Sequence, residues 1–177
     1  VRLRKAEFEL LQSQINPHFL YNTLDAIIWL AEAGEQKKVV SMVGNLSEFF
    51  RTSLNQGKDI ISIREELQHV RSYLEIQQVR YQDILKYEIQ VPKEINKYMI
   101  PKITIQPLVE NALYHGIKNK RGPGRITVGA KREEEYFVIF IEDNGIGINK
   151  ERLEQVRNKI LYKTSAENDI YGLYNVN

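Results

Sequence analysis

The sequence predicts an α+β protein in which a helical region is followed by a two-layer α/β sandwich. Apolar residues recur at helical spacing over 6–81, and alternation of apolar and polar residues begins near residue 84. Helical spacing returns between the later alternating runs, which is the order of elements in an α/β layer domain. The 177 residues fit one large domain or two small ones. We therefore divide the chain into a helical part, 1–81, and a sandwich part, 82–177.

The composition excludes several classes of protein. Apolar residues make up 42% and charged residues 27% of the chain, as in ordinary globular domains, and the longest apolar run, 26–31, is too short to cross a bilayer. The net charge of +2 provides no global field that would attract nucleic acid, and we expect none as a partner. The chain has no cysteine, which excludes disulfides and thiolate chemistry. It begins with Val rather than Met, so we expect an excised piece of a longer protein.

Three helices are expected in the helical part. The first covers 6–33, is bent at Pro17 and stops at a glycine. The second covers 39–54. The third follows Ser62, a capping residue with two glutamates in the next turn, and ends near residue 81.

The sandwich part combines strands and helices. The elements expected in order are a strand over 84–91, a helix from near Pro101 or Pro107 to Gly116, strands over 125–131 and 136–142, a helix over 149–161 and another from Gly172.

The segment Gln14–Asn22 places a histidine beside a helix-breaking proline. Helical spacing groups a polar stripe of Gln14, His18, Asn22 and Asp25. The apolar side carries Ile15, Phe19, Leu24 and Ile28. His18 should therefore face water, where a neutral imidazole has a lone pair for attack near pH 7. A surface histidine beside a kink is the ordinary alternative, but Pro17 costs about 3 kcal/mol inside a helix and amides rather than charges surround the ring, which favours a reactive His18.

The segment Gln106–Gly116 is an amphipathic helix with an unusual polar side. That side carries Glu110, Asn111, Tyr114 and His115. A carboxylate and an amide together suit Mg²⁺, which keeps several waters and binds phosphate oxygens. A solvated helix face is the alternative explanation for this segment taken alone.

The segment Glu142–Ile148 follows a predicted strand and contains two glycines. An Asp-Asn-Gly sequence after a strand often indicates a hairpin, but the charged residues that follow have helical spacing, so the glycines lead into a helix. Asp143 can accept a hydrogen bond from an adenine amino group, and glycines admit a ligand close to the backbone. The phosphate-binding loops of P-loop and Rossmann proteins and the motifs of protein kinases are missing. ATP would therefore bind in another way.

In this order the three segments resemble the sensor histidine kinases of the LytS/YesM type, over nearly the whole chain. Asn16–Asn22 looks like the phosphoacceptor box, Gln106–Ala112 like the N box, and Asp143–Gly147 and Gly172–Asn175 like the two glycine boxes. The helical connector is similar at Phe50–Leu54, Arg64–Leu67, Tyr73–Ile76 and Arg80–Tyr81. Each motif is short, but their joint order is highly specific.

The resemblance implies a helical dimerisation and phosphoacceptor region followed by an ATP-binding sandwich of the kind found in gyrase, Hsp90 and MutL. His18 would be the phosphoacceptor, and Asn22 would orient water for the reverse dephosphorylation. Asn111 would hold Mg²⁺ and the phosphates of ATP, with Glu110 as a weaker candidate beside it. The other implied nucleotide contacts are His115, Asp143, Gly145, Gly147, Gly172 and Leu173.

The chain departs from the pattern of histidine kinases at several positions. Phe19 stands where the commonest type has an acidic residue, so the general base is unassigned, and Tyr114 replaces a frequent N-box lysine. Ile170 and Tyr174 depart from the second glycine box. The family sandwich continues with further strands, so we expect an incomplete sandwich at the C-terminal end.

The leading hypothesis is ATP-dependent autophosphorylation of His18 and transfer to an aspartate of a response regulator. The resemblance also implies a homodimer and the cytoplasmic part of a cell-membrane protein, whose sensor and membrane-spanning part are missing here. One alternative keeps the nucleotide fold but makes it an ATP-hydrolysing switch or a serine kinase. Another is a nucleotide-binding dimerisation module without catalysis.

Overall fold

The computed structural model describes residues 17–54 and 58–162, and it confirms the predicted α+β class. The elements in order are α2 (Pro17–Glu32), α3 (Gln36–Leu54), β1 (Ile60–Ser62), α4 (Ile63–Arg80), β2 (Leu85–Gln90), the 3₁₀ turn η2 (Lys93–Ile95), β3 (Met99–Pro101), α5 (Gln106–Asn111), the π-helix η3 (Ala112–Ile117), β4 (Gly124–Arg132), β5 (Phe137–Asp143) and α6 (Lys150–Tyr162). Within the described ranges, no helix has the length and apolar content that a membrane span needs.

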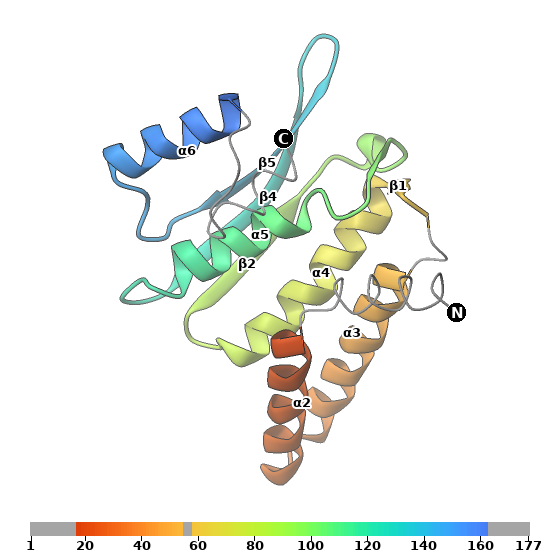
Figure 1. Ribbon diagram of the computed structural model, residues 1–177. Coiled ribbons are helices and arrows are strands. Elements are labelled where there is room, and N and C mark those ends of the chain that lie inside the picture. Colours follow the sequence, from red (N-terminus) through yellow and green to blue (C-terminus); the bar gives the residue numbers. More distant parts are fainter. Residues whose placement is uncertain (1–16, 55–57, 163–177) are drawn as a thin grey trace, which may run out of the picture.

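Helices α2 and α3 form a hairpin at one end of the molecule (Figure 1). The turn between them contains Gly34 at φ +74°, a left-handed conformation that favours glycine. The buried face of α2 is formed by Phe19, Thr23 and Leu30. Leu24 and Ile28, which the sequence places on the apolar side with Phe19, are 41% and 57% exposed. The predicted bend at Pro17 involves residues outside the described ranges.

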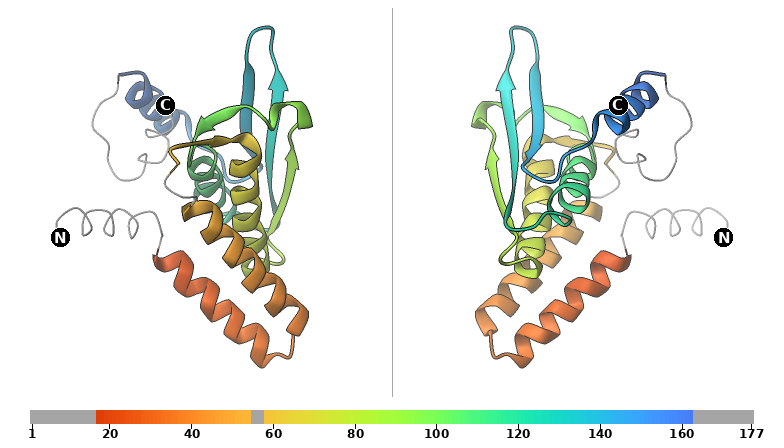
Figure 2. Two further views of the ribbon diagram at one scale, coloured as in Figure 1. Left: turned by 90° about the vertical axis from the view of Figure 1, so that its right-hand side faces the viewer. Right: turned by 90° about the vertical axis from the view of Figure 1, so that its left-hand side faces the viewer.

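The sheet order is β2-β4-β5, with β2 parallel to β4 and β4 antiparallel to β5. Helices α4 and α5 cover one face of this sheet, so the sandwich has two layers (Figure 2). A second, two-stranded sheet pairs β1 with β3 in antiparallel register. Strands β1 and β3 were not predicted, because strands of three residues are too short for a recognisable alternation.

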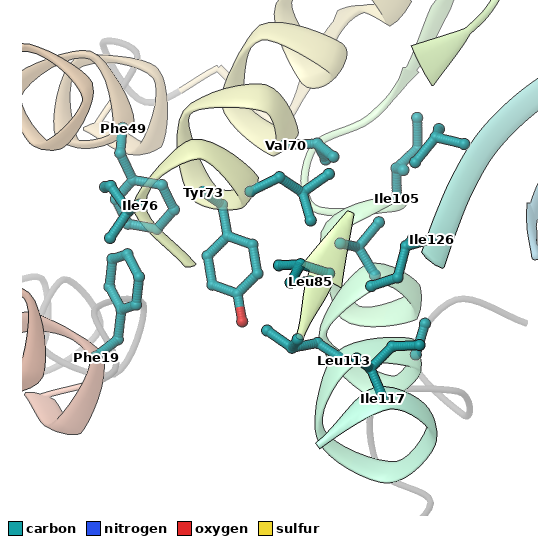
Figure 3. Close-up of a cluster of buried hydrophobic side chains, with 14 of the residues drawn as sticks. Phe19, Phe49, Val70, Tyr73, Ile76, Leu85, Ile105, Leu113, Ile117 and Ile126 are labelled. Carbon is teal, nitrogen blue, oxygen red and sulfur yellow. The ribbon is translucent and has the colours of Figure 1, made fainter. Parts of the chain in front are cut away.

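Helix α4 is the central element of the fold. Its start is closed by a capping box, in which the Ser62 hydroxyl accepts from the Glu65 N–H and the Glu65 carboxylate accepts from the Ser62 N–H. One side of α4 packs on the hairpin through Tyr73, whose ring lies 5.2 Å from that of Phe19. Its apolar residues share one core with Leu85, Ile105, Leu113 and Ile126 of the sandwich (Figure 3). The core therefore continues across the proposed boundary at residue 81, and that boundary stays a prediction.

His69 is a buried titratable group in this core. Its ring stacks on Phe49 at 4.4 Å between centroids, and its Nδ1 lies 2.9 Å from the Thr52 hydroxyl. Burial, together with the smaller effect of the positive charge of Lys102, lowers the pKa of His69 from 6.5 to about 4. The unfolded chain therefore binds a proton between pH 6.5 and pH 4 that the folded protein excludes.

We predict that this proton uptake makes the protein less stable as the pH falls through that window. Between pH 7 and pH 4, the free energy of unfolding should fall by about 3 kcal/mol more in the unsubstituted protein than in His69→Gln, which has no ring to protonate. Chemical denaturation at several pH values measures the difference. Parallel pH profiles of the two proteins would show that His69 accepts its proton without cost to the fold.

Candidate functional site

A pocket of about 400 Å³ opens between the π-helix η3, the loop after β5 and the start of α6. Four residues predicted from two separate motifs line it together, namely Asn111, His115, Asp143 and Gly147. The other lining residues are Gly116, Asn119, Ile146, Ile148, Asn149, Arg152 and Val156. The tertiary fold therefore brings the N-box helix and the first glycine box to one cavity of a size that suits a small ligand.

The helix that carries Asn111 and His115 changes from α to π geometry where it meets the pocket. The N–H of Lys118 donates to the carbonyl of Leu113, five residues earlier, at 2.9 Å. Such wide turns are rare and are frequent at functional sites. The predicted helix is confirmed, but Gly116 lies inside the π-helix rather than past its end.

The two glycines in the loop after β5, Gly145 and Gly147, occur there for different structural reasons. A Cβ on Gly145 would lie 2.4 Å from backbone atoms of Gly116, so only glycine lets the loop pack this closely on η3. The Ile146 N–H secures this approach by donating to the Gly116 carbonyl at 3.2 Å. Gly147 instead has φ +71° and lines the pocket, with open space where a Cβ would stand. Of the two, Gly147 is the glycine that borders the space for a ligand.

Asp143 ends β5 with its carboxylate at the pocket. Its Oδ1 accepts a hydrogen bond from the Gly145 N–H at 2.8 Å, which fixes the orientation of the carboxylate. The Oδ2 atom can then accept a hydrogen bond from the amino group of a ligand. Gly116 leaves the room for this side chain, because a Cβ there would lie 2.4 Å from Oδ1.

Glu110 and Tyr114 lie on a different side of the helix from Asn111. The Glu110 Oε1 accepts from the Gln106 side-chain amide at 2.9 Å, and the Tyr114 hydroxyl lies 3.4 Å from the Gln77 amide of α4. Burial raises the pKa of the Glu110 carboxyl above its ordinary value. Glu110 lies close enough to Tyr73 of α4 for the two groups to interact, whereas Asn111 borders the pocket.

His18 is exposed at the start of α2, as the sequence predicts. The side-chain nitrogen of Asn22, one turn later, lies 2.9 Å from the His18 Nδ1, so the predicted pair is in contact. Phe19, which stands where an acidic residue is common in the family, is 3% exposed and packs on Phe49 at 4.9 Å between ring centroids. The helix thus directs the imidazole outward and uses the next residue as a core anchor.

The two predicted sites lie on separate parts of the molecule. His18 belongs to α2, whereas the pocket is formed by η3, β5 and α6, and the views of Figures 1 and 2 agree in placing α2 apart from α6. Gly172 and Leu173, the predicted contacts from the second glycine box, lie outside the described residues. In the part of the chain that the structure describes, no three His, Cys, Asp or Glu side chains form a group that could hold a metal ion.

Several residues of the pocket were not predicted, of which Arg152 and Asn149 are polar and close to the loop. The Asn149 Oδ1 accepts from the Arg152 N–H at 2.8 Å, as a helix-capping residue does. The helix predicted over 149–161 already puts Arg152 in its first turn beside the loop, and this position is the signal that identifies Arg152.

Two family models match the chain in the same order as the structural parts. The model described as histidine kinase matches residues 6–85. The model described as histidine kinase-, DNA gyrase B-, and HSP90-like ATPase matches residues 101–177. Together they cover most of the chain.

Three sensor proteins illustrate the relationship to known kinases. The sensor histidine kinase YesM of Bacillus subtilis is 41% identical over 86% of this chain and 26% of its own length. The sensor histidine kinase BtsS of Escherichia coli K12 is 36% identical over 80% of this chain and 25% of its own, and the sensor protein LytS of Oceanobacillus iheyensis is 34% identical over 99% and 30%. The chain thus spans less than a third of the length of each relative. It belongs to the sensor histidine kinases of the LytS and YesM type.

Proposed function

We propose that this chain is the catalytic portion of a two-component sensor histidine kinase, which transfers the γ-phosphoryl group of ATP to His18 and then to an aspartate of a response regulator. The observation that carries the proposal is the pocket in which Asn111, His115, Asp143 and Gly147 meet. The exposed His18, in contact with Asn22, supplies the matching acceptor. Membership of the sensor histidine kinases supports the same conclusion.

The lining of the pocket fits ATP with Mg²⁺. An acceptor for an adenine amino group is available at Asp143, and the Asn111 side-chain oxygen is a ligand type that Mg²⁺ accepts. Arg152 adds a cation to the lining. Asn111 would hold the metal, which when bound neutralises negative charge on the phosphate oxygens. Asp143 would hold the base, and Gly147 would let the backbone pass beside the nucleotide.

The chemistry requires an accessible nucleophile and accurate positioning. A ring nitrogen of His18 attacks the γ-phosphorus, the new N–P bond replaces the bond to the bridging oxygen of ADP, and the ring proton passes to solvent. The contact with Asn22 restricts the rotation of the imidazole, because the amide lies within hydrogen-bond distance of the ring. We assign Asn22 this orienting role as well as the proposed orientation of water during dephosphorylation of the regulator.

The separation of His18 from the pocket requires movement or a second subunit. A homodimer is supported by the surface of the hairpin, where α2 exposes Leu24 and Ile28 and α3 exposes Val40 and Val43. Apolar side chains at helical spacing on neighbouring helices are the pattern of a helical-bundle interface. We further propose that this portion lies on the cytoplasmic side of a membrane-anchored protein.

An ATP-hydrolysing switch of the gyrase and Hsp90 kind would use the same pocket, and a binding module without catalysis would use it without turnover. Neither explains the exposed His18 with Asn22 in contact. The kinase is therefore the function that accounts for both parts of the chain.

The first prediction from the proposed function concerns the acceptor. Incubation with ATP labelled in the γ-phosphate should label the protein with a group that is stable in base and lost in acid, because the N–P bond hydrolyses when protonated. His18→Gln should lose the label completely while it binds nucleotide with unchanged affinity, since the pocket lies on other elements. Undiminished labelling of this variant would exclude His18 as the acceptor.

The second prediction concerns the adenine end of the pocket. Asp143→Asn should weaken nucleotide binding by roughly ten- to a hundredfold, because it removes a charged hydrogen-bond acceptor while retaining an oxygen for the Gly145 N–H. Isothermal titration measures the change. Glu142→Gln is the matched control, since neighbouring strand residues point to opposite faces of the sheet. Equal loss in both variants would mean that the effect does not come from a specific hydrogen bond between Asp143 and the base.

The third prediction concerns the dimer. Ile28→Glu should shift the complete protein toward the monomer in light scattering, because it places a charge in the proposed apolar interface. Ile60→Glu is the control, since Ile60 has nearly the same exposure, 56% against 57%, but lies on β1. A dimer that withstands the change at Ile28 would place the interface elsewhere.

A further inference from the structure

The buried carboxylate of Glu66 binds the turn that leads into α5, the helix that ends at Asn111. Glu66 lies on α4 and is 1% exposed. Its Oε1 accepts from the N–H groups of Ile105 and Gln106 at 2.9 and 3.4 Å, and its Oε2 accepts from the N–H of Ile103 at 3.1 Å. These are backbone donors at and before the start of α5, where a helix has N–H groups without partners inside the helix. The carboxylate of one helix therefore caps another.

The same turn contains a strained residue. Ile103 has φ +61°. Within the described ranges, it is the one residue other than glycine with a positive φ. A β-branched residue rarely adopts this left-handed conformation, which persists only where the surroundings enforce it. The bond from its N–H to Glu66 is one such constraint. Glu66 thus holds the backbone in a path that the local sequence disfavours.

A second contact joins this turn to the phosphoacceptor hairpin. The Lys102 ammonium donates to the Ser53 carbonyl of α3 and lies close enough to Glu66 for their charges to interact. The turn is therefore held from α3 on one side and from α4 on the other. Its position is determined by tertiary contacts rather than by its own sequence.

The geometry points to Glu66 as a positioning residue for Asn111, an inference that rests on the proposed function. Helix α5 has six residues and ends at Asn111, so the path of the backbone at its start determines where Asn111 lies. The apolar contacts of Val109 and Ala112 hold one face of the helix against the core. The bonds to Glu66 hold its beginning and thereby orient the Asn111 amide toward the pocket. Glu66 itself is absent from the pocket lining described above.

A glutamine cannot replace this carboxylate. Both oxygens of Glu66 accept hydrogen bonds from backbone N–H groups, whereas the NH₂ end of an amide would face such a donor with another donor. Glu66→Gln therefore keeps the size of the side chain but loses one end of the clamp and its negative charge near the helix start.

The experiment compares binding of a non-hydrolysable ATP analogue to the complete protein with MgCl₂ and with EDTA. Asp143 binds the base without help from the metal, whereas Asn111 contributes through it. In Glu66→Gln, the increase in affinity that Mg²⁺ produces should therefore be at least tenfold smaller than in the unsubstituted protein. The affinity measured in EDTA should be unchanged. Glu65→Gln is the matched control, because glutamine also serves in a capping box, and it should behave as the unsubstituted protein.

Adding Ile103→Gly separates positioning from stability. Glycine adopts the left-handed conformation without strain, so Glu66→Gln with Ile103→Gly should regain thermal stability but not the affinity gained from Mg²⁺. Recovery of both would overturn the inference, as would a normal Mg²⁺ effect in Glu66→Gln or failure of both variants to fold. Lack of nucleotide binding by the unsubstituted protein would instead refute the proposed function on which the inference rests.

Discussion

The burial of α4 on two sides is the constraint on which the rest of this structure depends. Towards the hairpin, the Tyr73 ring contacts the rings of Phe19 and Phe49. Towards the sandwich, Val70 and Leu74 join the core beneath β2 and η3. Burying side chains of this size contributes about 1.5–3 kcal/mol each, which is large against the net stability of a domain. Helices α2 and α5 therefore keep their places because both pack on α4.

Polar groups inside this packing are placed where a helix start needs them. Two neighbouring glutamates of α4 show the principle, since Glu65 caps α4 itself and Glu66 caps α5. A buried carboxylate is costly unless several donors compensate it, and the three N–H groups around Glu66 do so. The fold thus uses one buried charge to connect α4 to the start of α5.

Local patterns in the sequence predict most elements of the fold but few of the tertiary contacts. Helical spacing and capping residues indicate α2, α3, α4 and α6, and alternation indicates β2, β4 and β5. The pairing of β1 with β3 joins Ile60 to Pro101, and no local pattern contains such a distant partner. The pocket residues Asn111 and Asp143 were predicted from motifs, whereas the role of Glu66 was not, because in sequence it resembles any acidic residue in a first helical turn. Gly145 was predicted as a nucleotide contact. In the structure, glycine is required there because a Cβ would clash with the backbone of Gly116, a contact made only in the folded chain.

The anchoring of Phe19 limits how a phosphoryl group can reach His18. The two residues are adjacent on α2, so a movement that pulls α2 alone toward the pocket exposes the buried Phe19 ring and opens its contacts with Phe49 and Tyr73. Exposing a buried aromatic side chain to water costs about 1.5–3 kcal/mol, and the cavity that it leaves adds to this cost. The approach of a pocket from a second subunit leaves these contacts intact, whereas moving the hairpin together with α4 would open the core that α4 shares with the sandwich. The proposed transfer is therefore least costly when the acceptor helix stays packed and the nucleotide is brought to it.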